Sequence, residues 1–294
     1  MTDTKKPETN GELRHVPITC RIAEFGFGML SILRRFWRSP GNFLRDALYY
    51  FDMRFEISDL AKAYGKGERL VIRGWQRARE CGDFVALAHI QRYEWVSPRV
   101  AELECLDAGC GSGYGTHHLA TNGAGSVVGV DLSRMAIRLA KNKYNSENLQ
   151  FGIMDVRNLA AKDDSFDAVI SFDVMEHLDR GDQDSFVSEM ARVLRPKGHA
   201  YTGCPNASAS SGTNPFHLGE LTRNEFETLL RKHFRDVQVL GQDLIHEGRR
   251  QFGDMTVVGR VGALNMDNFI IVDERSESTY GLLAVCESAF KNVP

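Results

Sequence analysis

Leu106-Asp107-Ala108-Gly109-Cys110-Gly111-Ser112-Gly113-Tyr114-Gly115 is the stretch that decides the fold of this 294-residue chain. A short apolar run ends beside an acid and leads directly into alternating small residues. Because glycine has no Cβ, it adopts positive φ readily and lets a ligand lie against the backbone. A strand that enters such a turn and continues as a helix forms a nucleotide cradle. The stretch therefore predicts an α/β fold with a nucleotide site; the alternative is a plain structural turn.

The spacing of the glycines selects among nucleotides. Dinucleotide folds use G-x-G-x-x-G, whose third glycine would fall at Tyr114, whereas this chain has G-x-G-x-G. Asp107 precedes the first glycine and would repel a pyrophosphate but attract an ammonium group. We therefore predict that Asp107, Gly109, Gly111 and Gly113 bind the amino-acid end of S-adenosylmethionine (SAM), which is cationic and has no phosphate.

Two more acids follow the next two apolar runs. Asp131 comes 24 residues after Asp107, near the offset of roughly 20 at which an acid meets ribose hydroxyls in nucleotide folds. A carboxylate accepts two hydroxyl hydrogen bonds, so Asp131 is the predicted ribose clamp. The alternative is a charge that stabilises a helix N-terminus. Asp155 ends the third run, and we expect it to accept the adenine amino group.

Three later motifs complete a recognisable order. They are SFDAVISFDVMEHL at 165–178, VLRPKGH at 193–199 and NPFHLGE at 214–220. Together with the glycine stretch, VVGVDLS and the upstream HIQRY, they resemble the class I SAM-dependent methyltransferases. The resemblance is to the branch with ubiquinone-biosynthesis O-methyltransferases and bacterial small-molecule and glycan methyltransferases. It covers about residues 67–242 and implies SAM as cofactor, whose site would also include Arg92, Leu132, Val156 and Phe172.

The resemblance also implies an architecture. We expect a Rossmann-like, seven-stranded sheet with helices on both faces, preceded by an N-terminal helical extension. Residues 1–20 are expected to be a disordered tail, 21–100 a helical segment that caps the cofactor, and 101–294 the SAM-binding domain. Residues 242–279 exceed the usual connection between strands. They are expected to be an insertion that folds over the active-site face or builds a contact in a homo-oligomer.

Methyl transfer to a hydroxyl requires that the acceptor lose its proton. Ligands bind at the carboxyl ends of strands in open α/β sheets, so the candidates follow the fourth and fifth strands. We predict that His177 and Glu176 remove the proton and that His217 contacts the acceptor; the alternative for each is a structural hydrogen bond. Asp173, Glu176 and His177 form D-x-x-E-H, which resembles the metal-holding E-x-x-E-H of some ubiquinone-pathway relatives. The resemblance implies Mg²⁺ there, although this chain has Asp at the first position.

Composition limits the partners and the compartment. The net charge of −3 does not favour a broad nucleic-acid surface. The six cysteines are scattered without C-x-x-C pairs, which favours neither a zinc site nor a disulfide framework. No stretch approaches the roughly 18 consecutive apolar residues of a membrane span. We expect a cytoplasmic methyltransferase that acts on oxygen of a small molecule or of a lipid- or polysaccharide-linked sugar.

Residues 22–50 interleave aromatic and aliphatic residues with arginines. Such a basic amphipathic segment either lies in a membrane interface or packs on the domain or a partner subunit. We favour packing; the membrane reading would make the protein membrane-peripheral. Two other functions stay open, a non-catalytic SAM-binding subunit of a partner enzyme and a dinucleotide oxidoreductase, which the glycine spacing disfavours.

Overall fold

The computed structural model describes residues 84–210, 212, 214, 216–246, 249–250, 269–272 and 279–290. All of them belong to the unit Leu48–Pro294. The predicted tail, the amphipathic segment at 22–50 and most of the predicted insertion lie outside the described residues. Their predicted roles therefore remain predictions.

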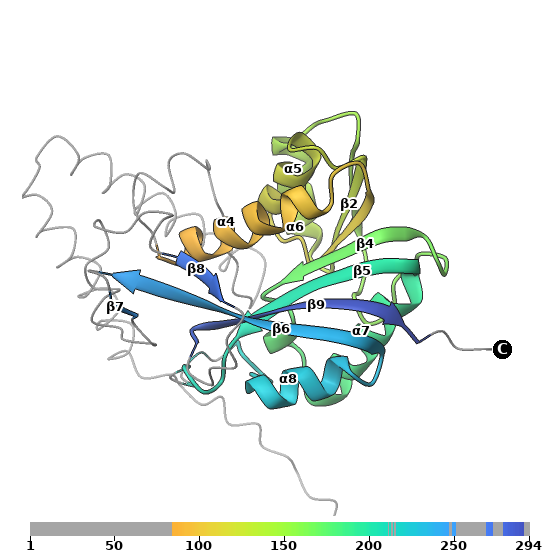
Figure 1. The fold of residues 1–294 in the computed structure, drawn as a ribbon. Helices are drawn as coiled ribbons and strands as arrows, with labels where there is room; N and C mark the ends of the chain where they lie inside the picture. Colours follow the sequence, from red (N-terminus) through yellow and green to blue (C-terminus); the bar gives the residue numbers. More distant parts are fainter. Residues whose placement is uncertain are drawn as a thin grey trace, which may run out of the picture. The chain divides into compact units, whose positions relative to one another are not determined.

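The successive apolar runs of the sequence form five parallel strands (Figure 1). They are β1 (Glu104–Ala108), β2 (Ser126–Asp131), β3 (Leu149–Ile153), β4 (Phe166–Phe172) and β5 (Leu194–Pro205). The strands are ordered β3-β2-β1-β4-β5-β9-β6-β7, so the order reverses between β1 and β4. In open α/β sheets, ligands bind at the carboxyl ends of strands beside such a reversal.

The last strands add antiparallel pairings and extend the sheet. β9 (Gly281–Ala289) lies between β5 and β6 (Phe234–His246) and is antiparallel to both. β7 (Arg249–Arg250) and β8 (Phe269–Val272) both pair with the far half of β6. The described residues thus form nine strands rather than seven, because β6 continues to His246 and pairs there with β7 and β8. The Rossmann-like fold is confirmed.

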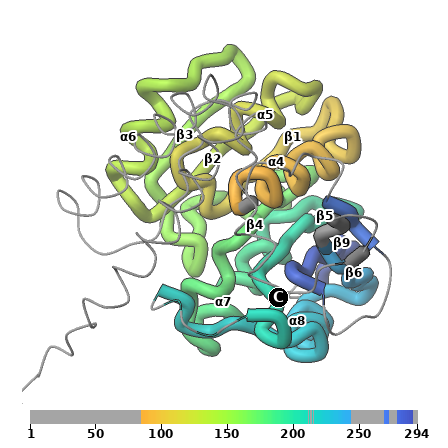
Figure 2. The backbone as a smooth tube through the Cα atoms, turned by 90° about the vertical axis from the view of Figure 1, so that its left-hand side faces the viewer, coloured from red at the N-terminus to blue at the C-terminus, as the bar shows by residue number. Residues whose placement is uncertain are grey.

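Helices cover both faces of the sheet, as predicted (Figures 1 and 2). One face carries α4 (Phe84–Val96), α5 (Tyr114–Thr121) and α6 (Arg134–Lys143); the other carries α7 (Arg180–Val193) and α8 (Arg223–Leu230). Two short 3-10 helices are η1 (Ser97–Arg99) and η2 (Met175–His177). Within the described residues, no helix has the length and apolar character needed to cross a bilayer.

The alternation of side chains along the strands divides the apolar interior into two cores. Cys105 packs with the buried residues of α4 and α5, whereas its neighbour Leu106 packs with those of α7 and α8. This is the period of two expected for a sheet covered on both faces. Each core therefore fixes one layer of helices relative to the strand ends that carry the candidate site.

Local signals in the sequence place the helix starts. The Ser133 hydroxyl accepts a hydrogen bond from the amide of Ala136 and caps α6. Thr222 and Glu225 form a capping box at the start of α8. Caps of this kind satisfy amides that have no partner within the helix. The helices thus begin at the carboxyl edge of the sheet, beside the candidate site.

Candidate functional site

The glycine turn joins β1 to α5 at the carboxyl edge of the sheet. Gly109, Gly111 and Gly113 have φ values of 83°, 54° and 81°. A Cβ at Gly109 would lie 2.3 Å from Cγ2 of Val174, and one at Gly113 would lie 2.8 Å from the Phe151 ring. Side chains are therefore excluded at both positions by the packing of these neighbours, whereas a Cβ at Gly111 would meet no atom within 4 Å.

Asp107 lies beneath the turn and is 1 % exposed. Oδ2 accepts a hydrogen bond from Oγ1 of Thr116 at 2.6 Å, and Oδ1 accepts one from the Tyr93 hydroxyl at 3.2 Å. Burial raises the pKa of Asp107 to about 6, while both hydrogen bonds oppose the shift and Asp131 adds repulsion. A cation held above this carboxyl would favour its charged form.

Asp131 ends β2 and holds the middle of the turn. Oδ2 accepts from the amide of Gly111 at 3.0 Å, and Oδ1 accepts from the amide of Ser133 at 2.7 Å. Each carboxylate oxygen has further lone pairs, so these bonds leave capacity for ribose hydroxyls. The structure therefore brings the two predicted parts of the cofactor site, the turn and Asp131, into direct contact.

Two large apolar side chains stand exposed beside Asp131. Leu132 follows it directly and is 63 % exposed, and Ile153, the last residue of β3, is 52 % exposed. Exposed apolar side chains at the rim of a polar turn offer surfaces for a flat base. Sequence reasoning included Leu132 but missed Ile153. The only signal for Ile153 in the sequence is its place at the end of an apolar run, directly before Met154 and Asp155.

The other predicted cofactor residues, Asp155, Val156 and Phe172, are either bonded by another side chain or buried. The Asp155 carboxylate is bonded by Arg157, whose Nη2 lies 2.6 Å from Oδ2, and this bond lowers the pKa of Asp155. Val156 and Phe172 are buried, each in a different core. An adenine contact at Asp155 would have to share its oxygens with Arg157.

Arg92 and Asp173 lie together, the first buried and the second partly buried. Nε of Arg92 donates to Oε1 of Gln242 at 2.7 Å, and its Nη1 forms an ion pair with Oδ1 of Asp173. Oδ2 of Asp173 lies 2.6 Å from Nε2 of His89. Burial alone would raise the pKa of Asp173, but Arg92 and His89 together hold it well below its ordinary value. The guanidinium charge of Arg92, a predicted cofactor residue, is thus compensated by the Asp173 carboxylate.

A second group of side chains lies after β4 and β5. Glu176, His177 and His217 each present one ligand atom, and these atoms lie within 4.8 Å of one another. The two imidazole rings meet edge to face, with centroids 5.2 Å apart. The structure therefore brings Glu176 and His177 together with His217 rather than with Asp173. The predicted D-x-x-E-H set is corrected in its first member, because the Asp173 carboxylate is taken up by His89 and Arg92.

The hydrogen bonds of the two histidines decide what each can offer. Nδ1 of His177 lies 3.0 Å from the carbonyl oxygen of Phe216. Because a carbonyl only accepts, Nδ1 carries the proton and Nε2 keeps a lone pair. Nδ1 of His217 lies 2.5 Å from Oε1 of Glu220, and its Nε2 lies 2.9 Å from Nδ2 of Asn214. His217 would have to give up Asn214 to bind a metal.

The donor set therefore fits a metal only in part. Two imidazoles with one carboxylate suit Zn²⁺, Mn²⁺ or Fe²⁺ better than Mg²⁺, which prefers oxygen ligands. Because Nδ1 is bonded to a carbonyl, the ring of His177 is fixed, and its Nε2 is oriented either to accept a proton or to bind a metal.

A latch holds the loop after β5 against η2. The amides of Leu218 and Gly219 donate to the carbonyl of Glu176 at 2.7 and 3.0 Å, and Nε2 of the buried Gln183 donates to the carbonyl of Gly219 at 2.6 Å. A Cβ at Gly219 would lie 2.7 Å from that Nε2. The latch sets His217 beside His177 and leaves Phe216 and Leu218 exposed, at 38 % and 68 %. Sequence reasoning missed Gln183.

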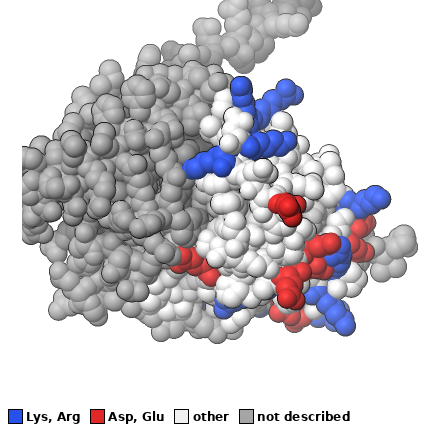
Figure 3. Space-filling view, turned by 90° about the horizontal axis from the view of Figure 1, so that it is seen from above, with Lys and Arg blue, Asp and Glu red and all other residues white. Residues whose placement is uncertain are grey.

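Basic side chains gather on the outer face of α6 (Figure 3). The exposed ones are Arg134, Arg138, Lys141 and Lys143, and the helix holds no acid. This local positive charge contrasts with the net charge of −3 of the whole chain. The face is complementary to an anionic surface.

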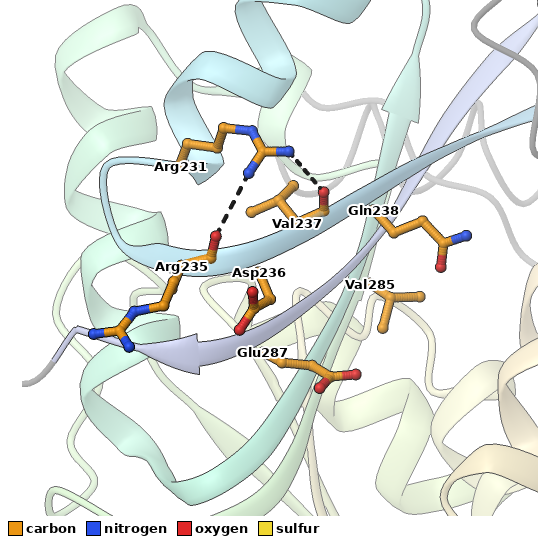
Figure 4. Close-up of a pocket in the computed structure, with 7 residues that line it drawn as sticks. All are labelled: Arg231, Arg235, Asp236, Val237, Gln238, Val285 and Glu287. Atoms are coloured by element: carbon orange, nitrogen blue, oxygen red, sulfur yellow. Dashed lines mark hydrogen bonds between the residues drawn. The ribbon is translucent and has the colours of Figure 1, made fainter.

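A cleft also lies far from the glycine turn, at the amino end of β6 (Figure 4). Its lining consists of Arg231, Arg235, Asp236, Val237, Gln238, Val285 and Glu287. Arg231 donates to the carbonyls of Arg235 and Val237 and so secures the turn between α8 and β6. Because β6 runs parallel to β5, this end of β6 is opposite the carboxyl edge where the candidate site lies. We assign these contacts a structural role.

Comparison with known proteins finds similarity to methyltransferases. Residues 105–198 match a family described as methyltransferase domain. A probable S-adenosylmethionine-dependent methyltransferase of Mycolicibacterium smegmatis is 36% identical over 143 residues, which are 47% of this chain and 54% of that protein. A phthiotriol/phenolphthiotriol dimycocerosates methyltransferase of Mycobacterium ulcerans is 33% identical over 117 residues, 38% of this chain and 41% of that protein. The chain spans about half the length of the first of these relatives.

A solved structure agrees on the fold. It is a SAM-dependent methyltransferase, possible histamine N-methyltransferase, from Thermotoga maritima, with a TM-score of 0.54. The match covers 73% of this chain and 94% of that chain at 16% identity. At this identity the likeness concerns the fold alone.

Proposed function

We propose that this chain carries a class I, SAM-dependent methyltransferase domain that moves the methyl group of SAM to an oxygen of a small molecule or of a lipid- or polysaccharide-linked sugar. The observation that carries the proposal is the bond between Asp131 and the Gly111 amide. It joins a turn of three positive-φ glycines to the acid that ends the next strand. A turn with carboxylates on both sides suits a cationic, phosphate-free nucleoside better than a pyrophosphate.

Each part of the cofactor has a candidate partner. The backbone of the glycine turn would hold the amino-acid end, with the Asp107 carboxyl beneath it. Asp131 would hold the ribose, and Leu132 and Ile153 would lie against the adenine. SAM supplies a methyl group on a sulfonium, whose departure as a neutral sulfide needs no acid catalyst. The protein therefore has to position the acceptor and take its proton.

His177 is the proposed base. In the step, the acceptor oxygen forms a bond to the methyl carbon while the carbon–sulfur bond breaks, and the hydroxyl proton moves to Nε2 of His177. The carbonyl of Phe216 holds Nδ1–H and so keeps Nε2 as the acceptor nitrogen. The charge that develops on His177 would be stabilised by nearby Glu176. His217, held by Glu220, would then contact the acceptor by exchanging its bond with Asn214.

A metal version of this step uses the same residues. Glu176, His177 and His217 would hold a divalent cation that lowers the pKa of the acceptor hydroxyl. The version requires His217 to exchange its bond with Asn214 for the metal. The side-chain chemistry favours Mn²⁺ or Zn²⁺ over the Mg²⁺ implied by the family resemblance.

The surroundings of His177 bear on the acceptor. Phe216 and Leu218 are exposed on a loop that the Glu176 carbonyl and Gln183 hold in place. Because the loop is fastened by its backbone, these side chains stay at the surface beside the proposed base. They suit an acceptor with an apolar portion next to its hydroxyl, such as a lipid-linked one. The M. ulcerans relative, named for a lipid acceptor, supports this choice.

The test combines binding and turnover. Calorimetry of the full chain with SAM and with NADH separates a methyltransferase from an oxidoreductase. Incubation with methyl-labelled SAM and two acceptor sets, hydroxylated lipids and free sugars, then measures S-adenosylhomocysteine and labelled product. We expect SAM binding and label in the lipid set. SAM binding without S-adenosylhomocysteine from either set or from a whole-cell extract would favour a non-catalytic subunit, and absence of SAM binding would reject the proposal.

A further inference from the structure

Four polar contacts form a continuous, largely buried chain of side chains from the glycine turn to the far half of the sheet. The hydroxyl of Tyr114, the first residue of α5, lies 2.7 Å from Nδ1 of His89. Nε2 of His89 lies 2.6 Å from Oδ2 of Asp173. Oδ1 of Asp173 pairs with Nη1 of Arg92, and Nε of Arg92 donates to Gln242 at 2.7 Å. The chain thereby links α5, α4, the end of β4 and β6.

The chemistry of the groups fixes the direction of these bonds. A carboxylate only accepts, so Nε2 of His89 donates to Asp173 and, in the neutral ring, Nδ1 is left as an acceptor. The Tyr114 hydroxyl therefore donates to Nδ1. Both arms end on Asp173, so its carboxylate determines the orientation of His89 and, through it, of Tyr114.

The backbone of Asp173 is also unusual. Its φ is 54°, a left-handed conformation that residues other than glycine seldom adopt. The amide of Asp173 donates to the carbonyl of Gly203 at 2.9 Å, which holds this conformation from the β5 side. The next residue, Val174, packs directly on Gly109, where a Cβ would lie 2.3 Å from Cγ2. Asp173 thus meets the glycine turn twice, through Val174 at its start and through His89 and Tyr114 at its end.

We propose that Asp173, held by Arg92 and acting through His89 and Tyr114, is a positioning residue that holds the glycine turn in its SAM-binding shape. The inference rests on the proposed function and deepens it. It also separates Asp173 from any metal bound by Glu176, His177 and His217. A turn that is already ordered loses less conformational freedom when the ligand binds, so release of the turn weakens affinity without removing a contact to the ligand.

Two variants test the hydrogen-bonded chain, one at Asp173 in its centre and one at Tyr114 at its end. Asp173→Asn keeps the size of the side chain and tolerates positive φ, but removes the charge that orders His89 and Arg92. Tyr114→Phe removes one hydroxyl. We expect Tyr114→Phe to weaken SAM binding about 3- to 10-fold, as for a neutral hydrogen bond, and Asp173→Asn to weaken it at least about 10-fold. Tyr201→Phe is the matched control, a buried tyrosine outside the chain, and should leave affinity unchanged.

The double variant supplies the decisive measurement. Tyr114 and Asp173 share no direct bond in this chain; His89 connects them. If the hydrogen-bonded chain positions the turn, Tyr114→Phe adds little to the loss of SAM affinity already caused by Asp173→Asn. If the two residues have independent structural roles, their fold-losses in affinity multiply. Calorimetry at a temperature well below the unfolding of every variant measures the affinities. The melting temperature without SAM reports any purely structural effect.

The outcomes are distinguishable. Losses that do not multiply, with melting temperatures near that of the parent, support the proposal. Unchanged affinity in Tyr114→Phe, or multiplied losses, overturns it. If Asp173→Asn does not fold, His89→Gln takes its place in the cycle with Tyr114→Phe. Failure of the parent protein to bind SAM would instead reject the proposed function. Titration with Mn²⁺ gives an independent check, since Asp173→Asn should leave its binding unchanged while His177→Gln weakens it.

Discussion

The ring of Tyr93 lies directly against Gly115, so closely that a Cβ on Gly115 would be 2.0 Å from Cζ of the ring. This approach brings the Tyr93 hydroxyl to Asp107, 3.2 Å from Oδ1. Tyr93 comes from α4, Gly115 from α5 and Asp107 from β1. One missing side chain in the glycine stretch thus allows the helix before the domain to reach the acid beneath the cofactor turn.

The first prediction concerns this contact. Gly115→Ala should push the Tyr93 ring away and lower the free energy of unfolding by about 1–3 kcal/mol, the usual effect of overpacking a core. Urea denaturation measures the change. Gly181→Ala in the first turn of α7 is the control, because the nearest atom to its Cβ, Oδ1 of Asp179, lies at 3.5 Å. Equal effects of the two substitutions would contradict the importance of the Tyr93 contact.

Asp131 gives the second prediction. Asp131→Ala should weaken SAM binding by about 1–3 kcal/mol, because two ribose hydrogen bonds to a charged group are lost. Calorimetry with SAM checks this. Asp163→Ala is the control, since Asp163 is 72% exposed and pairs with Arg192. If Asp131→Ala folds and binds SAM like the parent, Asp131 is not the ribose clamp.

The third prediction is a pH dependence of SAM affinity. Burial raises the pKa of Asp107 to about 6 from an ordinary value of 3.8. Below pH 6 the group is therefore mostly neutral in the free protein, whereas the ammonium of SAM favours the carboxylate. Affinity should rise as pH increases from about 5 to about 7, with release of a proton on binding at the lower end.

Calorimetry in buffers of different ionisation enthalpy detects that proton. In Asp107→Asn the pH dependence over this range should flatten, and persistence of the slope would assign it to another group. The sign for stability is opposite. Because the folded pKa is the higher one, the contribution of Asp107 to the stability of the SAM-free protein falls as pH rises through 4 to 6.

His177 and His217 give the fourth prediction. His177→Gln should lower kcat by about 10²–10⁴, the range for loss of a general base, and change SAM affinity little. His217→Gln should mainly raise KM for the acceptor. Treatment with a chelator separates the two versions of the mechanism: activity restored by a divalent cation selects the metal, and insensitivity selects direct proton transfer. Near-normal kcat in His177→Gln would leave His177 with a structural role.

The basic face of α6 gives the fifth prediction. Vesicles with anionic lipids should bind the protein in a salt-sensitive manner if this face meets a membrane, since each basic residue near such a surface contributes about 1 kcal/mol. Flotation measures binding. Arg138→Glu with Lys141→Glu should reduce it, while Lys162→Glu, outside α6, serves as control. Unchanged flotation of the α6 variant would assign any membrane binding to another part of the chain.

The sequence by itself determined the parts that depend on neighbouring residues. Glycines at 109, 111 and 113 permit the positive φ that the turn adopts, an apolar run followed by Asp131 gives a strand with an acid at its carboxyl end, and Thr222 with Glu225 begins α8. These features follow from backbone sterics and local hydrogen bonds, which a linear sequence displays directly.

Tertiary structure alone decided which distant side chains meet. Asp173 reads as part of D-x-x-E-H, yet the fold places His89 and Arg92 of α4 on its carboxylate and brings His217 to Glu176 and His177. Buried Gln183 holds the Gly219 loop that makes this possible. A charge takes the partners that compensate it best in the folded interior, and those partners lie on segments whose approach no local pattern encodes.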